Sequence, residues 1–285
     1  MNIPNKMTAE NAVKLIKSGD RVLIQGGSAT PQALINAMVA RAPELRNVEL
    51  VHLHTEGACG YTAPELRESF HTNAFFIGGN IRKHIGDTAD YIPIFLSDIP
   101  SLFRQGYMDL DVVMINVSPP DKHGFCSLGV SVDIVLSGIE QGKKVIAQIN
   151  PFVPRTHGDS IIHIKNIDCA IEVNAPIHTH AISAISEIEQ KIGKHVAGLI
   201  ENGATLQMGI GGIPDAVLRN LAGHKNLGIH TELFSDGVME MIEKGIITNS
   251  RKSIHPGKVV AGFVIGSKNL YTYIHDNPIF EMHPT

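Results

Sequence analysis

The amino-acid sequence contains two copies of one pattern, and this repeat restricts the chain to a fold built from two related halves. The segment LIKSGDRVLIQGGSATPQALINAM, beginning at Leu15, aligns with LIENGATLQMGIGGIPDAVLRNL, beginning at Leu199. Further along, His54-Thr55-Glu56 returns as His230-Thr231-Glu232. Because the motifs keep their order, each copy is expected to form the same supersecondary unit.

Each copy has the pattern of a strand, a glycine-containing loop, a helix and a second strand. In the second copy the spacing predicts strands over residues 205–208 and 227–231, with a helix beginning near Pro214. Strands that alternate with helices of this size form mainly parallel sheets covered by helices. We therefore expect two related α/β domains, over residues 1–184 and 185–285.

The second copy is shorter than the first. AFFIGGN at Ala74 is echoed by AGFVIGS at Ala261, and the first copy then continues for about a hundred residues before the second begins. After the second copy of this motif only a short tail follows. The sequence thus predicts that the second domain is truncated.

One group of residues in the second copy is suited to chemistry. Parallel strands share a carboxyl edge, so the loop from Gly209 to Gly212 and Glu232, which follow neighbouring strands, should face each other. Glycines allow backbone N–H groups to approach a ligand, and a carboxylate opposite them can act as nucleophile or general base. The alternative is a glycine loop needed for packing, beside a solvated glutamate. Glu56, after its own loop at Gly26-Gly27-Ser28, is the rival nucleophile.

Three other polar groups carry weaker signals. His178-Thr179-His180 has the spacing of a metal-binding pair, but no carboxylate-rich motif accompanies it, and we expect no metal site. His123 and Cys126 could form a thiolate pair, although a buried, inert cysteine is the better interpretation. The polar cluster Arg155-Thr156-His157-Gly158-Asp159-Ser160, which follows an apolar strand predicted from Lys144 to Ile149, could orient a carboxylate substrate or hold a loop.

Composition excludes several partners. The 24 Lys and Arg against 28 Asp and Glu leave no basic surface for nucleic acid. The longest uncharged stretch contains too many polar residues to span a membrane, and the N-terminus lacks the apolar core of a secretory signal. The three cysteines are widely spaced and form no CxxC motif, which argues against a disulfide framework or a structural zinc site. We expect a cytoplasmic protein without a membrane partner.

Four motifs occur in order along the chain: SPPDKHGFCSLGVSVD from Ser118, PRTHGD from Pro154, LIENGATLQMGIGGIPDAV from Leu199, and HTELFSDGV from His230. Together they resemble the acetyl-CoA hydrolase/transferase family, especially its 4-hydroxybutyrate and butyryl-CoA:acetate CoA-transferase members. The resemblance implies two α/β domains of the CoA-transferase/ribose-5-phosphate isomerase type, with the active site between them. It places the family's nucleophile at Glu232 rather than Glu56. It also assigns coenzyme A and oxyanion binding to the loop Gln207, Met208, Gly209, Ile210, Gly211 and Gly212.

This resemblance implies an acyl-CoA:carboxylate CoA-transferase that works through a glutamyl-CoA thioester. Acyl-CoA and a short-chain carboxylic acid would be its substrates, with no tightly bound cofactor and a homodimeric assembly. The alternatives are an acetyl-CoA hydrolase, a truncated and inactive domain, and, last, a metal hydrolase using His178 and His180. Since Glu232 must be ionised to react, we expect it in a polar environment.

Overall fold

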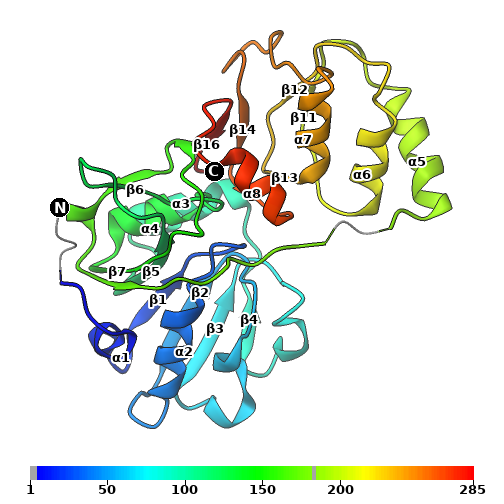
Figure 1. The fold of residues 1–285 in the computed structure, drawn as a ribbon. Helices are drawn as coiled ribbons and strands as arrows, with labels where there is room; N and C mark the ends of the chain where they lie inside the picture. Colours follow the sequence, from blue (N-terminus) through cyan, green and yellow to red (C-terminus); the bar gives the residue numbers. More distant parts are fainter. Residues whose placement is uncertain (1–4, 182–183) are drawn as a thin grey trace. The chain divides into compact units, whose positions relative to one another are not determined.

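The computed structural model describes residues 5–181 and 184–285, and these form two compact units (Figure 1). The first unit comprises the chain up to Arg155 with residues 161–178 and 284–285. The second comprises residues 156–160 and the described residues between Thr179 and His283. The domain division at residues 184 and 185 remains a prediction, since compactness alone does not establish a domain.

A seven-stranded parallel sheet forms the centre of the first unit, in the order β10-β7-β5-β1-β2-β3-β4. Its strands are β1 (Arg21–Ile24), β2 (Val48–His52), β3 (Phe70–Ala74), β4 (Ala89–Tyr91), β5 (Val112–Val117), β7 (Lys144–Ile149) and β10 (Cys169–Glu172). Every residue of β5 is buried, as expected for a central strand of a parallel sheet covered on both faces. A separate antiparallel pair joins β6 (Phe125–Ser127) to β9 (Ile161–His163).

Helices cover both faces of this sheet. They are α1 (Ala9–Ala12), α2 (Gln32–Ala40), α3 (Ile99–Arg104) and α4 (Val135–Gln141). Side chains alternate along β1, so Val22 and Ile24 join the buried cluster beneath α1 and α2, whereas Leu23 faces α4. The helix comes very close there: a Cβ on Gly138 would lie 2.1 Å from Leu23 Cδ2. Gly138 is therefore required for helix–sheet contact.

The second unit contains smaller parallel groups: β11 (Thr205–Leu206) with β12 (Gly228–Ile229), β13 (Leu233–Phe234) with β15 (Phe263–Val264), and β14 (Val259–Ala261), β16 (Phe280–Met282) and β8 (His157–Gly158) together. A single bridge between His230 and Val260 connects the first group to the third. The helices are α5 (Glu187–Ala197), α6 (Gly212–Arg219), α7 (Asp236–Glu243) and α8 (Lys268–Ile274).

The predicted α/β class with mainly parallel sheets is confirmed. The structure also contains the repeat. β1, α2 and β2 have the same order and parallel pairing as β11, α6 and β12. The strand predicted over 205–208 ends at Leu206, since the N–H of Met208 donates to a side chain instead of a neighbouring strand. The helix expected near Pro214 begins two residues earlier, at Gly212.

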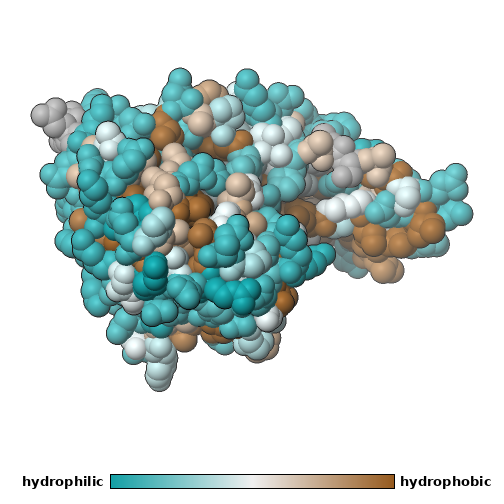
Figure 2. All heavy atoms as spheres, turned by 90° about the horizontal axis from the view of Figure 1, so that it is seen from below, coloured by the Kyte–Doolittle hydropathy of each residue, from teal (hydrophilic) through white to brown (hydrophobic). Residues whose placement is uncertain are grey.

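The two copies of the repeat differ in how many neighbours their first strand, β1 or β11, has. β1 pairs with both β2 and β5, whereas within the described part of the chain β11 pairs only with β12. Helix α5 and the residues just after it present apolar side chains to solvent, with Ile188 in the helix 71% and Leu199 beyond it 83% exposed, and Figure 2 shows this apolar surface. Among residues 5–181 and 184–285, no helix is both long and apolar enough to cross a membrane.

Substitution of Gly138 tests the helix–sheet contact. Gly138→Ala should lower the free energy of unfolding by about 1–3 kcal/mol, because the new methyl group overlaps Leu23 in a close-packed core. Gly79→Ala is the control, since a Cβ there meets no atom within 4 Å. Urea unfolding followed by far-UV circular dichroism measures both variants, and equal stability of the two would contradict the contact.

Candidate active site

The buried hydroxyl of Thr231 joins the ends of the two strands that carry the candidate site. Thr231 lies just beyond β12, and its Oγ1 accepts a hydrogen bond of 2.8 Å from the N–H of Met208, just beyond β11. The same oxygen is 2.9 Å from the carbonyl oxygens of Met208 and Leu233, either of which can take its proton. This side chain therefore fixes the glycine loop to the segment that carries Glu232.

Backbone hydrogen bonds hold the other side of that segment. The Thr231 N–H donates to Val260 O at 3.0 Å, and the N–H groups of Gly262 and Phe263 donate to Glu232 O at 2.8 and 3.0 Å. The peptide units around Glu232 are thus bonded on both flanks. Its side chain nevertheless remains exposed, so the carboxylate is accessible on a firmly held backbone.

Glu232 has a different environment from the polar one we expected. Burial of part of the side chain raises the pKa of its carboxyl above the usual value, and no other cause contributes. Within residues 5–181 and 184–285, no donor forms a hydrogen bond to this carboxylate, because the neighbouring Thr231 hydroxyl is already bonded to backbone atoms. The carboxylate is consequently accessible but partly desolvated, and it has no hydrogen-bond partner among the described residues.

The loop after β11 is open. None of the backbone N–H groups from Gly209 to Ile213 donates to an acceptor in the described residues. Gly211 has φ +112°, a conformation that residues with a Cβ rarely adopt, and a Cβ there would meet nothing within 4 Å. Gly212 differs, since a Cβ on it would lie 2.1 Å from Glu189 Oε1. Free donors at the start of α6 are suited to an anion or oxyanion.

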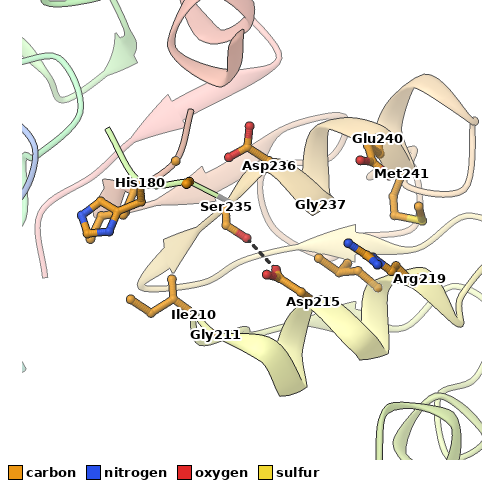
Figure 3. A pocket seen from close by; sticks show the side chains of 14 residues that line it. His180, Ile210, Gly211, Asp215, Arg219, Ser235, Asp236, Gly237, Glu240 and Met241 are labelled. Carbon is orange, nitrogen blue, oxygen red and sulfur yellow. Dashed lines mark hydrogen bonds between the residues drawn. The ribbon is translucent and has the colours of Figure 1, made fainter. Parts of the chain in front are cut away.

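A cavity of about 380 Å³ lies beside the loop (Figure 3). Ile210 and Gly211 line it, whereas the other predicted site residues, Gln207, Met208, Gly209, Gly212 and Glu232, do not. Most of the remaining wall comes from α6, α7 and their flanking segments, including Asp215, Arg219, Ser235, Asp236 and Glu240. The sequence candidate His180 also lines the cavity, with Ala181, Ile265 and Gly266.

Sequence reasoning missed these acidic walls. Ser235 Oγ donates to Asp215 Oδ1 at 3.2 Å, as the dashed line in Figure 3 shows. Burial, and then the charges of Asp236 and Glu240, act to raise the pKa of Asp215. The sequence marks this position only through Ser235-Asp236-Gly237, which is typical of a helix start because Ser and Asp commonly begin helices.

The first copy uses the same motif differently. A Cβ on Gly26 would lie 2.5 Å from His54 O, so this glycine is needed for close packing. His54 Nε2 lies 3.0 Å from Glu56 Oε1, and the Glu56 N–H donates to the hydroxyl of Thr30. Glu56 thus has a partner, and its loop is packed where that of the second copy is open.

The weaker sequence candidates have structural explanations. Cys126 is buried in β6, and burial raises the pKa of its thiol to about 12, which confirms the interpretation of an inert cysteine. Arg155 forms an ion pair of 2.9 Å with Asp121 and holds that loop. His178 and His180 belong to no group of three metal-binding side chains within the described residues.

A family model for the acetyl-CoA hydrolase/transferase N-terminal domain matches residues 4–182. The chain belongs to the acetyl-CoA hydrolase/transferase family. Over 271 residues it is 46% identical to a succinyl-CoA:acetate/propanoyl-CoA:succinate CoA transferase of Fasciola hepatica, covering 94% of this chain and 56% of the relative. It is 43% identical to a 4-hydroxybutyrate coenzyme A transferase of Clostridium kluyveri, covering 97% and 65% respectively.

Solved structures of this family match both units. A 4-hydroxybutyrate CoA-transferase from Porphyromonas gingivalis is 40% identical, with a TM-score of 0.88 over 98% of this chain and 67% of that chain. RipA from Yersinia pestis is 29% identical, with a TM-score of 0.91 over 98% and 68%. The chain therefore spans between just over half and about two thirds of these family members.

Thr231→Val tests the link between the two strand ends. The substitution keeps the shape but leaves the partly buried N–H of Met208 without its acceptor, so it should lower the free energy of unfolding by about 1–3 kcal/mol. Thr231→Ser keeps the hydroxyl and should lower the free energy of unfolding by a smaller amount. Circular dichroism is the appropriate signal because the chain has no tryptophan, and equal losses in both variants would contradict the role of the hydroxyl.

The pKa of Glu232 predicts a pH-dependent stability difference. A carboxyl whose pKa is raised by folding favours the folded state at low pH and loses that contribution as pH rises through the folded-state pKa. Glu232→Gln should therefore melt at a higher temperature than the unsubstituted protein at pH 7.5. The difference should shrink as pH falls below about 4 and vanish by about pH 3, where the glutamate is protonated in both states. A lower melting temperature at pH 7.5 would show that the carboxylate is stabilised instead.

Proposed function

We propose that this chain carries the catalytic glutamate of an acyl-CoA:carboxylate CoA-transferase of the 4-hydroxybutyrate, butyrate or acetate type. The observation that carries the proposal is an accessible, unpaired Glu232 carboxylate on a backbone tied to an open loop with free N–H groups. Relatives that share 43–46% of their aligned residues are named as CoA transferases. Their printed names differ in the carboxylic acid but share the transfer of coenzyme A.

In the proposed reaction, Glu232 attacks the carbonyl carbon of the acyl-CoA. The C–S bond breaks, and an acyl-glutamyl anhydride and the CoA thiolate are formed. The thiolate then attacks the glutamyl carbonyl, which releases the first carboxylate and leaves a glutamyl-CoA thioester. A second carboxylate reverses these steps, so coenzyme A is a substrate and no tightly bound cofactor takes part.

The residues around Glu232 support specific roles in these steps. Poor solvation makes an ionised carboxylate more reactive, since less water must be removed before it attacks. We assign stabilisation of the tetrahedral oxyanion and coenzyme A contacts to the loop Gln207, Met208, Gly209, Ile210, Gly211 and Gly212. Loss of one oxyanion donor generally raises a barrier by about 2.7–4 kcal/mol. The loop residue Gly211, with its positive φ, is the position where a side chain would disturb this loop most.

The acidic cavity limits where the rest of coenzyme A can bind. Asp215, Asp236 and Glu240 line it against the single guanidinium of Arg219. Nucleotide phosphates would be repelled there, whereas the uncharged pantetheine arm would not. The proposal therefore requires that the phosphates lie outside this cavity.

Two further assignments go with this function. We propose a homodimer, supported by the exposed apolar side chains of α5, because such surfaces commonly mark protein interfaces. We also propose a cytoplasmic location, supported by three cysteines that form no disulfide, as is usual in reducing compartments.

Intact-mass analysis after brief incubation with an acyl-CoA tests the nucleophile. A CoA adduct should appear on the peptide that contains Glu232 and should be absent from Glu232→Gln. Glu56→Gln is the matched control, because it changes the corresponding glutamate of the first copy and should retain the adduct. An adduct on the Glu56 peptide, or none on the folded protein, would falsify the assignment.

Hydrolysis is the alternative that one observation favours, since the exposed side chain of Glu232 is open to water. A hydrolase would consume acetyl-CoA at the same rate with and without an added carboxylic acid. A transferase should consume it several-fold faster when butyrate or 4-hydroxybutyrate is added. Release of free CoA and formation of the new acyl-CoA can be followed together by chromatography.

A further inference from the structure

Three side chains of the second unit converge, although His255 lies 26 positions before Glu281 and 28 before His283 in the sequence. His255 Nδ1 lies 3.0 Å from Glu281 Oε2, and His283 Nε2 lies 3.4 Å from the same oxygen. One donor atom from each of the three residues falls within 4.8 Å of the others. Their side chains are 40%, 21% and 24% exposed for His255, Glu281 and His283, so the group is partly shielded yet reachable.

These separations suit a common metal ion. A tetrahedral Zn²⁺ with bonds of about 2.0–2.1 Å places its ligand atoms roughly 3.3 Å apart. Two imidazoles and one carboxylate are a donor set that zinc and other first-row divalent ions accept, with one position left for water. The observed distances of 3.0 and 3.4 Å therefore need only small side-chain movements to receive the ion.

His283 also has the partner that metal-binding histidines usually have. Its other ring nitrogen, Nδ1, lies 2.9 Å from Asp159 Oδ2. A carboxylate at this position accepts the Nδ1 proton and leaves the lone pair of Nε2 directed at the metal. Asp159 follows β8, in the short segment that joins the second unit from a distant part of the chain.

The backbone and the charges at this cluster are consistent with a bound cation. His255 has φ +49°, an uncommon left-handed conformation for a residue with a side chain. Lys258 Nζ lies 3.4 Å from Glu281 Oε1 and leaves Oε2 to the two imidazoles.

We propose that His255, Glu281 and His283 form a binding site for a divalent transition-metal ion of the zinc class, with Asp159 orienting His283. The ion would connect the loop at His255 to β16 and, through Asp159, to the segment after β8. The ring of His230 packs edge-on against His255 at 6.2 Å between centroids. The ion thus stabilises the strand that leads into Glu232, and this role is independent of the acyl-transfer chemistry.

Metal titration of the 285-residue chain tests the proposal. The protein is prepared without a histidine tag, treated with a chelator and titrated with Zn²⁺ by calorimetry and with Co²⁺ by visible absorption. One equivalent should bind, the Co²⁺ spectrum should show tetrahedral bands, and Zn²⁺ should raise the melting temperature. Asp159→Asn should weaken binding about 10–100-fold, as expected for loss of an orienting carboxylate.

Two ligand variants and one control make the result specific. His283→Ala and Glu281→Gln should each abolish stoichiometric binding of the metal. If His283→Ala does not fold, Glu281→Gln alone tests the site. His71→Ala is the matched control, because His71 also pairs with a carboxylate, Asp90, at 2.9 Å but has no third ligand. Binding that persists in folded Glu281→Gln, or its absence from the unsubstituted protein at micromolar Zn²⁺, would overturn the proposal.

Discussion

The hydroxyl of Thr231 is the contact on which the candidate active site depends. The strands of the second unit are only two or three residues long, so their ladders alone cannot position the loops beyond them. Thr231 supplies a side-chain bond at the point where the ladder between β11 and β12 stops. Because it also lies directly before Glu232, one buried oxygen fixes both the loop of donors and the carboxylate.

The two copies of the repeat show how one backbone pattern can serve two purposes. In the first, Thr55 bonds to Tyr61 and Asn80, Gly26 packs against His54, and a histidine pairs with Glu56. In the second, the threonine bonds to the glycine loop itself and leaves the glutamate unpaired. Gly26 in the first loop is needed for packing, whereas a Cβ on Gly211 in the second loop would meet nothing within 4 Å.

The fold was accessible from the sequence because its signals are local and repeated. Alternation of short apolar strands with helices predicted the parallel sheets, and β7 falls on the predicted segment from Lys144 to Ile149. The link between the end of β11 and the segment just before Glu232 agrees with the rule that parallel strands share one edge, whereas the facing of Glu232 and the loop stays a prediction. The early end of β11 did not follow, since it depends on Thr231, which lies 23 residues from Met208.

The sequence did not predict the cluster of His255, Glu281 and His283, because it forms through contacts between distant parts of the chain. His255, Glu281 and His283 have no ligand-like spacing, and they meet only because β16 and the loop before β14 lie together. Asp159 was read as part of a cluster after β7, whereas the structure pairs its neighbours His157 and Gly158 with β16. Sequence spacing identifies sites within one βαβ unit, but it does not reveal a site assembled from three strands.

The cavity wall and the loop beside it differ in electrostatic character. The described wall beside the loop carries three carboxylates and one guanidinium, while the loop itself offers unpaired N–H groups. An anion is therefore stabilised at the loop but repelled a short way beyond it, along α7. A substrate that is neutral along its length and develops negative charge only at its reacting carbonyl matches this arrangement better than one that carries a charge throughout. A thioester on the uncharged pantetheine arm has this distribution, which agrees with the acyl-CoA reaction proposed at Glu232 as long as the nucleotide phosphates lie outside the cavity.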